Sequence, residues 1–285
     1  MSTKVVVSQR YPRIYRRAAA ARERWRETGE QTRFYGQTLS SLIDVVVNYR
    51  YEVLRQIASM SLGTGALAMV GGTVAIVTFL NLSTGGLIAT QGYNQLSMIG
   101  AEALTGFASA FINTRLISVG TAVVAFSATL GAGCTAQLGA MRINEEIDAL
   151  EVMGIRSVSY LAGTRVAAGV VVIGPLYCVA LLMEYLAARF GTTVLYGQGT
   201  GVYDHYFHTF FVPADVLNSF VTVTLMTVIV MLVHSYYGFT ATGGPAGVGR
   251  AVGRATRLSL VAGAVVLMSF SLALYGHTGN FNYAG

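Results

Sequence analysis

Carboxylates that directly follow an apolar segment are the residues of this sequence best placed to transmit force. The apolar stretch ending near Gly139 runs within a few residues into Glu145, Glu146, Asp148 and Glu151. A short helix joined rigidly to membrane spans can fit a groove of a soluble partner and pass on that partner's motion. The pattern therefore indicates a transport subunit that is moved by a separate motor.

The acidic segment 144–153 is predicted to be a short amphipathic helix on the inner side of a membrane. Asn144 can cap it, carboxylates in its first turn suit the positive end of the helix dipole, and Gly154 supplies a stop. The alternative is a helix resting on the membrane surface, but an anionic inner leaflet repels carboxylates. We expect the coupling contacts to come from Glu145, Glu146, Ile147, Asp148, Leu150, Glu151 and Met153.

A Gly-rich segment and an Asp/His cluster resemble a phosphate-binding loop and a metal site only in part. The Gly-rich segment 241–250 lacks the Gly-Lys-Ser/Thr end of a phosphate-binding loop, and Lys4 is the only lysine of the chain. Asp204, His205 and His208 could imitate a metal site, but the neighbouring Tyr and Phe residues favour an interfacial aromatic belt. We therefore expect no catalytic residue, no metal site and no cofactor in this chain.

Charged residues inside a membrane would mark an ion or proton path. Glu184 lies near the end of an apolar stretch with Arg189 five residues on, which favours a pair at the membrane boundary over a proton relay. Arg165 can extend its head group to the membrane surface. The sequence thus gives little support to a proton-coupled or sodium-coupled transporter.

Composition assigns the chain to the membrane proteins. With 53% hydrophobic and 11% charged residues, 285 residues cannot bury their apolar surface in one soluble core. The net charge of +6 is explained by membrane topology, because the arginines gather before the first span and in alternate loops. This distribution argues against nucleic-acid binding.

Apolar runs predict an all-α integral membrane protein with five spans, and six spans is the main alternative. Loops with and without arginine alternate, which predicts a multi-pass protein with a cytoplasmic N-terminus and an outer C-terminus. A short surface or re-entrant helix is expected on the outer side at 101–111. The spans are expected near 57–80, 113–138, 158–187, 214–238 and 256–275.

The residues before the first span divide into two parts. An Arg-rich extension, 1–31, is expected in the cytoplasm, where it sets topology or binds anionic lipid. A permease domain, 32–285, then begins with a helix at 33–55 whose apolar residues recur near helical spacing. That helix is predicted to lie in the membrane interface, and packing on the rest of the protein is the alternative.

Small residues recur along the second span. They allow close helix approach in a membrane, either within the chain or between subunits. The expected packing residues are Ala128, Gly131, Ala132, Thr135, Ala136 and Gly139.

Three motifs resemble the MlaE/YrbE permease family of ABC lipid transporters. They are Gln137-Leu-Gly-Ala-Met-Arg142, the acidic run from Glu145 to Ile155, and the Gly-rich stretch from Gly238 to Arg250. The Arg-rich N-terminus looks most like YrbE subunits of actinobacterial Mce systems. Many relatives have Glu where this chain has Gln137, which would suit a pair of non-equivalent permeases.

The resemblance implies two permease subunits in the inner membrane, with a cytoplasmic ATPase docked on the acidic helix and holding ATP and Mg²⁺. It also implies Mce-domain proteins on the outer face. The chain would then import fatty acids, phospholipids or sterols through a cavity shared with a second permease. The alternatives are a structural anchor for such an assembly and, third, a secondary transporter.

Overall fold

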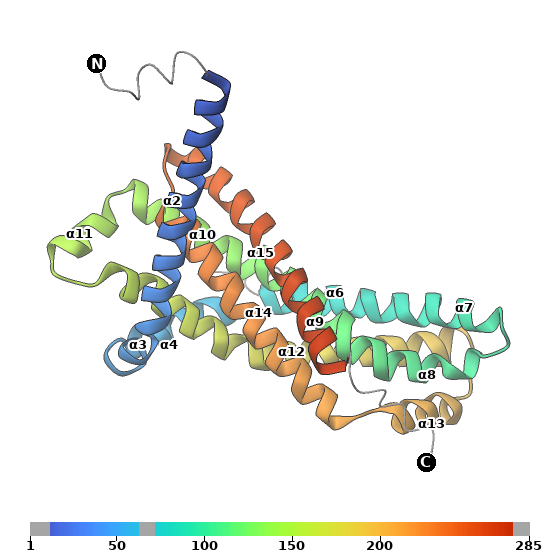
Figure 1. The fold of residues 1–285 in the computed structure, drawn as a ribbon. Helices are drawn as coiled ribbons and strands as arrows, with labels where there is room; N and C mark the ends of the chain where they lie inside the picture. Colours follow the sequence, from blue (N-terminus) through green and yellow to red (C-terminus); the bar gives the residue numbers. More distant parts are fainter. Residues whose placement is uncertain (1–11, 63–71, 276–285) are drawn as a thin grey trace.

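The computed structural model describes residues 12–62 and 72–275, and all regular structure in these ranges is helical (Figure 1). Five helical stretches are long and apolar enough to cross a membrane, which confirms the predicted all-α membrane fold. They are Thr73–Ser97, Glu102–Ile143, Val158–Leu195, Pro213–Phe239 and Gly244–Tyr275.

Figure 1 labels most of the helices that make up these stretches and the N-terminal region. Short π-helical segments join several of them, for example Ser109–Ile117 and Val158–Gly163. The α-helices are α2 Pro12–Ser40, α3 Leu42–Asn48, α4 Arg50–Leu62, α6 Thr73–Leu87, α7 Tyr93–Ser97, α8 Thr105–Ala108, α9 Ser118–Phe126, α10 Ala132–Ile143, α11 Glu146–Val152, α12 Thr164–Phe190, α13 Thr200–Phe210, α14 Pro213–Phe239 and α15 Gly244–Tyr275.

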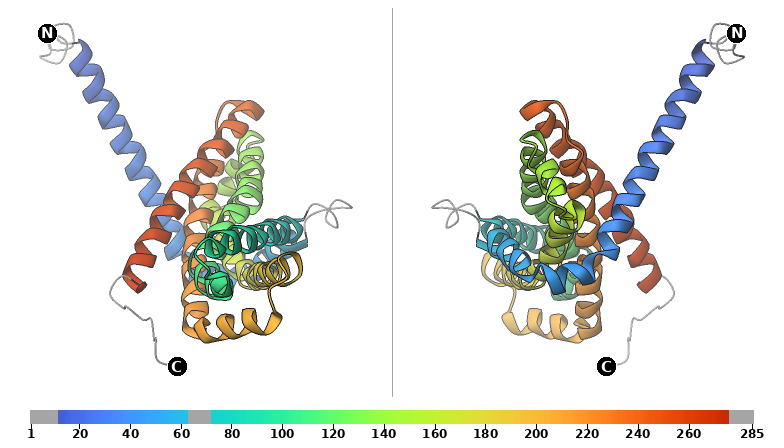
Figure 2. Two further views of the ribbon diagram at one scale, coloured as in Figure 1. Left: turned by 90° about the vertical axis from the view of Figure 1, so that its right-hand side faces the viewer. Right: turned by 90° about the vertical axis from the view of Figure 1, so that its left-hand side faces the viewer.

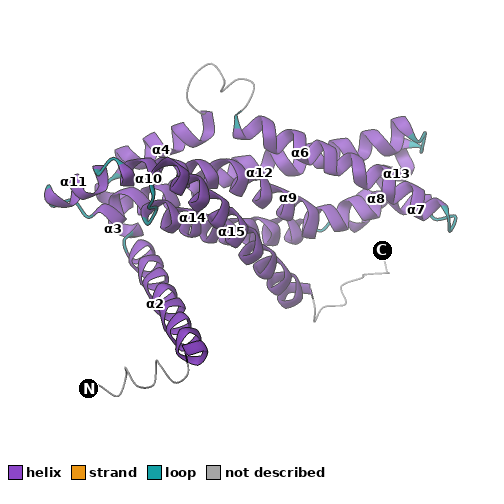
Figure 3. Ribbon diagram, turned by 90° about the horizontal axis from the view of Figure 1, so that it is seen from above, coloured by secondary structure: helices purple, strands orange, loops and turns teal. Residues whose placement is uncertain are grey.

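The first span differs from its predicted position. The predicted span 57–80 falls on the end of α4, on residues 63–71 outside the described ranges, and on the start of α6. The long apolar stretch of the structure is instead Thr73–Ser97, and α4 and α6 follow one another along α12 (Figure 3). The uncharged residues 81–98, expected as a loop, are almost wholly helical, because a lack of charge suits a membrane helix as well as an outer loop.

The second span is longer than predicted. The segment 101–111, expected as a separate outer helix, runs through a 3₁₀ turn, α8 and a π-helical segment into α9 and α10. A single helical stretch therefore extends from Glu102 to Ile143. The remaining three predicted spans fall inside the observed ones.

The N-terminal region also differs from its predicted division. One helix, α2, crosses the expected boundary at 31/32, and Pro12 suits its first turn because proline lacks only a donor that the first turn leaves unused. The predicted helix 33–55 is divided among α2, α3 and α4 at Ser41 and Tyr49. Both views of Figure 2 show α2 projecting from the other helices. Residues 1–11 of the extension and 276–285 of the tail lie outside the described ranges.

Helix α12 lies at the centre of the packing. It contacts α4 and α6 on one side and α9 and α14 on others. Close approach is possible because small residues occupy the crossings: a Cβ on Gly85 would lie 2.3 Å from the Glu184 carbonyl oxygen, and one on Gly169 would lie 2.9 Å from Met231. Helices α11 and α13 lie at opposite ends of this arrangement (Figures 1 and 3).

Candidate functional site

The acidic helix α11 forms a projection between α10 and α12 at one end of the molecule (Figure 1). Its start differs from the prediction. Asn144 ends α10 rather than capping α11, and Glu145 takes the capping position in a left-handed conformation with φ of 60°. This backbone conformation is uncommon for a residue other than glycine, and it turns the chain sharply between the two helices.

The end of α11 follows the prediction. Gly154 has a φ of 77°, which suits glycine because a side chain is strained there. The Gly154 amide donates to the Glu151 carbonyl at 3.0 Å, and the Ile155 amide donates to that of Leu150 at 3.0 Å. These bonds satisfy carbonyls that a helix end otherwise leaves without donors.

Side-chain contacts tie α11 to its neighbours on both sides. Ile147 is fully buried in the apolar core, and Leu150 packs against that core. Arg142 of α10 donates to Asp148 at 2.5 Å, and Ser157, just before the third span, donates to Glu151 at 2.6 Å. A displacement of α11 would therefore be passed to both the second and the third span.

The opposite face of α11 is open. Glu145, Glu146, Asp148 and Glu151 are exposed, and Met153 just beyond the helix is 66% exposed. The seven predicted coupling residues thus divide into an exposed, mostly acidic surface and two apolar residues, Ile147 and Leu150, that hold the helix in place. This arrangement can receive a partner without losing its own anchorage.

The small residues of the second span lie on two faces. Gly131 and Gly139 are buried, and a Cβ on either would meet His234 of α14 or Val248 of α15 within 2.8 Å. Thr135 is buried between them and donates to the His234 carbonyl at 2.9 Å. Ala128 and Ala136 are exposed and Ala132 is partly exposed. One face therefore packs within the chain, and the other is largely exposed in the part of the chain that the structure describes.

The amino-acid sequence was compared with known protein families and with individual proteins. The model of the permease family MlaE matches residues 63–273. The chain belongs to the MlaE permease family. A probable ABC transporter permease protein of Rickettsia bellii is 27% identical over 187 residues, which cover 62% of this chain and 68% of the relative.

Two further relatives are similar to this permease at lower identity. A probable ABC transporter permease protein of Porphyra purpurea is 23% identical over 218 residues, covering 75% of this permease and 81% of the relative. Protein TRIGALACTOSYLDIACYLGLYCEROL 1 of Arabidopsis thaliana is 23% identical over 171 residues, covering 60% of this permease and 49% of the relative. The resemblance inferred from the motifs is thereby confirmed.

The permease also contains buried polar groups that the sequence did not reveal. Glu184 was expected to pair with Arg189, but its side chain is fully buried and accepts a hydrogen bond from Ser118. Arg189 instead makes a bidentate pair with Asp204 of α13, with both N–O distances 2.8 Å. Helical spacing puts Glu184 on the inward face of α12, and this spacing could have predicted that its side chain is buried.

Two arginines of the permease are also enclosed, and one of them, Arg165, was expected to extend to the membrane surface. Arg115 pairs with Asp215 at 2.6 Å, although 100 residues separate them, and both side chains are nearly buried. Arg165 is 5% exposed and donates to the Leu161 carbonyl at 2.9 Å, so it does not extend to the surface. Buried charges need such partners because leaving water is costly.

Proposed function

We propose that this chain is the membrane subunit of an ATP-driven lipid transporter of Mce type, which imports fatty acids, phospholipids or sterols. Membership of the MlaE permease family, together with a relative named as a probable ABC transporter permease, supports the ABC transporter part of this proposal. A relative whose name includes trigalactosyldiacylglycerol supports a lipid as the substrate class. The chain itself is proposed to be non-catalytic, with ATP and Mg²⁺ held by a separate partner subunit.

The observation that carries the proposal is the pair of opposite faces on α11. Its carboxylates face outward while Ile147 is fully buried and its ends are bonded to the flanking spans. An ATPase that grips the exposed acidic face would move the second and third spans together. A helix that served only as a surface cover would not need bonds to both neighbours.

The transport cavity is proposed to form with a second permease subunit, a paralogue of this chain. The exposed alanine face of the second span supports this, because small residues allow close approach between helices in lipid. Mce-domain proteins would assemble on the outer face, at the α13 end. We place the protein in the inner membrane with its N-terminus in the cytoplasm.

The proposal is tested by replacing Glu145 and Glu146 with Gln and Asp148 with Asn in one variant. We expect normal membrane insertion, loss of the copurifying ATPase and loss of lipid uptake, because the acidic docking face is removed. Uptake of radiolabelled fatty acid and ATPase copurification provide the two measurements. A matched control replaces Glu27 and Glu30 of α2, both exposed, with Gln and should change neither.

Other outcomes separate the alternatives. Unchanged uptake in the triple variant would reject the coupling role of α11. An assembly that retains its outer proteins but never takes up lipid would identify a structural anchor. Uptake that continues without ATP and depends on a proton or sodium gradient would identify a secondary transporter.

A further inference from the structure

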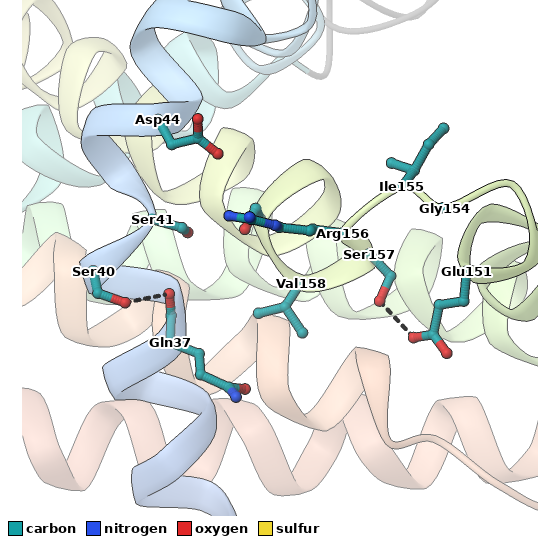
Figure 4. A pocket seen from close by; sticks show the side chains of 11 residues that line it. Gln37, Ser40, Ser41, Asp44, Glu151, Gly154, Ile155, Arg156, Ser157 and Val158 are labelled. Carbon is teal, nitrogen blue, oxygen red and sulfur yellow. Dashed lines mark hydrogen bonds between the residues drawn. The ribbon is translucent and has the colours of Figure 1, made fainter.

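A cavity of about 560 Å³ lies at the α11 end, between α2–α3 and the chain that leads from α11 into α12 (Figure 4). Its volume falls in the range of about 300–1,000 Å³ that is typical of small-molecule sites. The lining combines apolar side chains with serine hydroxyls, carboxylates and one guanidinium. None of these residues belongs to the exposed small-residue face of the second span.

The walls of this cavity are firmly held. Val45 of α3 is fully buried, and a Cβ on Gly163 would lie 2.7 Å from it. Tyr49 packs edge-on against Tyr160 with ring centres 5.3 Å apart. Because these contacts join α3 to the start of the third span, the cavity is preformed rather than a gap between loose segments.

Arg156 supplies an unused positive charge. Within the described ranges its guanidinium makes no hydrogen bond or ion pair, and Figure 4 shows its side chain directed toward Ser41 and Asp44. Ser159 is 7% exposed, and its hydroxyl has no partner in the described part of the chain. A guanidinium with hydroxyl donors beside it is suited to a phosphate group.

Two carboxylates also line the cavity. Asp44 accepts a bond from Asn48 at 2.5 Å, and Glu151 accepts one from Ser157 at 2.6 Å. Each carboxylate can accept further bonds. With two carboxylates and one arginine, the lining carries a formal net negative charge, which disfavours a purely anionic ligand and favours one that also carries an ammonium group.

Exposed apolar side chains of α3 indicate where the rest of such a ligand would lie. Ile43, Val46 and Val47 are 81%, 58% and 66% exposed, on the same short helix that contributes Asp44 to the cavity. In water such a surface is unfavourable, whereas acyl chains would cover it. A lipid, with its polar end in the cavity and its chains along α3, matches both surfaces.

We infer that this cavity binds the phosphoethanolamine headgroup of a membrane phospholipid, with its phosphate on Arg156 and its ammonium on the carboxylate of Asp44. The bound headgroup bridges α3 and the connection after α11. It thereby restrains the helix on which the ATPase is proposed to act. The lining residues are distinct from the exposed alanine face at which the transport cavity is proposed to form, and binding can be measured without ATP or a partner.

The inference is tested on the purified full-length chain by native mass spectrometry with phosphatidylethanolamine. We expect one retained lipid per chain, and Arg156→Ala should weaken its binding about tenfold, as for loss of a charged hydrogen-bond donor. Arg156→Lys should retain part of the affinity. The matched control Arg257→Ala removes an exposed arginine outside the cavity and should leave binding unchanged.

Two further arms identify the headgroup and its source. Phosphatidylglycerol should bind more weakly than phosphatidylethanolamine, and Asp44→Asn should reduce this preference. The Asp44→Asn variant tests the inference independently if Arg156→Ala does not fold. Free phosphoethanolamine at equal concentration should not displace the lipid. Equal binding of both lipids, no effect of Arg156→Ala, or displacement by the free headgroup would each overturn the inference.

Discussion

Glu184 shows how a carboxyl group is accommodated inside this membrane protein. Its side chain accepts a hydrogen bond from Ser118. One helical turn further along the second span, Thr121 donates to Asn81 of α6 at 2.9 Å. These bonds offset part of the cost of removing polar groups from water. The approach of α6 that completes this cluster depends on Gly85, which lies directly against the Glu184 backbone.

Gly85→Ala should therefore destabilise the protein. An added Cβ would lie 2.3 Å from the Glu184 carbonyl oxygen and 2.9 Å from the Ala187 Cβ, so α6 and α12 must separate. Overpacking of this kind costs about 1–3 kcal/mol. We expect a lower thermal unfolding midpoint in detergent.

The neighbouring glycine provides the control for this substitution. A Cβ on Gly86 would meet nothing within 4 Å, so Gly86→Ala should leave the midpoint unchanged or raise it slightly. Equal effects of the two substitutions would show that α6 and α12 do not approach closely at this point.

The expected pair of Glu184 and Arg189, which the structure replaces with two separate contacts, illustrates what a single sequence cannot give. Five residues of separation allow either a local pair or separate partners, and the choice depends on which residues a distant segment supplies. Asp204 reaches Arg189 only because α13 folds back against the end of α12. The sequence predicted the polar character of these positions but not their partners.

Helix α13 is held to α12 by the bidentate Arg189–Asp204 pair. The hydrogen bonds from Arg189 lower the pKa of Asp204 below its ordinary value, and burial opposes this only in part. A lowered folded-state pKa contributes stability above the unfolded value of about 3.9, and this stability is lost as pH falls through the folded value.

Asp204→Asn should consequently lower the unfolding midpoint at neutral pH but not at strongly acidic pH. The side chains are 48% and 38% exposed, so the stability difference should stay below about 1 kcal/mol. Thermal unfolding of both proteins between pH 7 and pH 3 provides the measurement. A difference that persists undiminished at the acidic end would mean that the substitution is unfavourable for a reason other than charge.

Prediction of the elements succeeded where the sequence pattern was local. The stop at Gly154 and the amphipathic character of the short helix follow from neighbouring residues, and the structure has them, with Ile147 and Leu150 on the apolar side. The first span was predicted at 57–80, before the observed stretch Thr73–Ser97. An apolar run rich in small residues can form part of a membrane helix or a connection between two helices, and its composition does not distinguish them. The left-handed conformation of Glu145 was not predicted either, because residues other than glycine seldom adopt it and no local pattern marks it.

The segments that connect the membrane helices lie at two opposite ends of the molecule. Helix α11 and the turn between α14 and α15 lie at one end, and α13 and the turn between α7 and α8 lie at the other (Figures 1 and 3). The connections at the α13 end, residues 98–101 and 196–212, contain no lysine or arginine. Arg115 and Arg189 lie in the helices that flank these connections, whereas Arg142, Arg156, Arg250, Arg254 and Arg257 lie in or beside the connections at the α11 end.

This asymmetry predicts that the α11 end faces the cytoplasm, since loops rich in arginine stay inside. Met153→Cys and His208→Cys report the two ends, because both positions are exposed. A Cys178→Ala background removes the exposed native thiol, while Cys134 is buried. A membrane-impermeant maleimide should label Met153→Cys only in inverted vesicles and His208→Cys only in intact cells. Labelling of Met153→Cys in intact cells would put the acidic helix outside, where no ATPase could reach it.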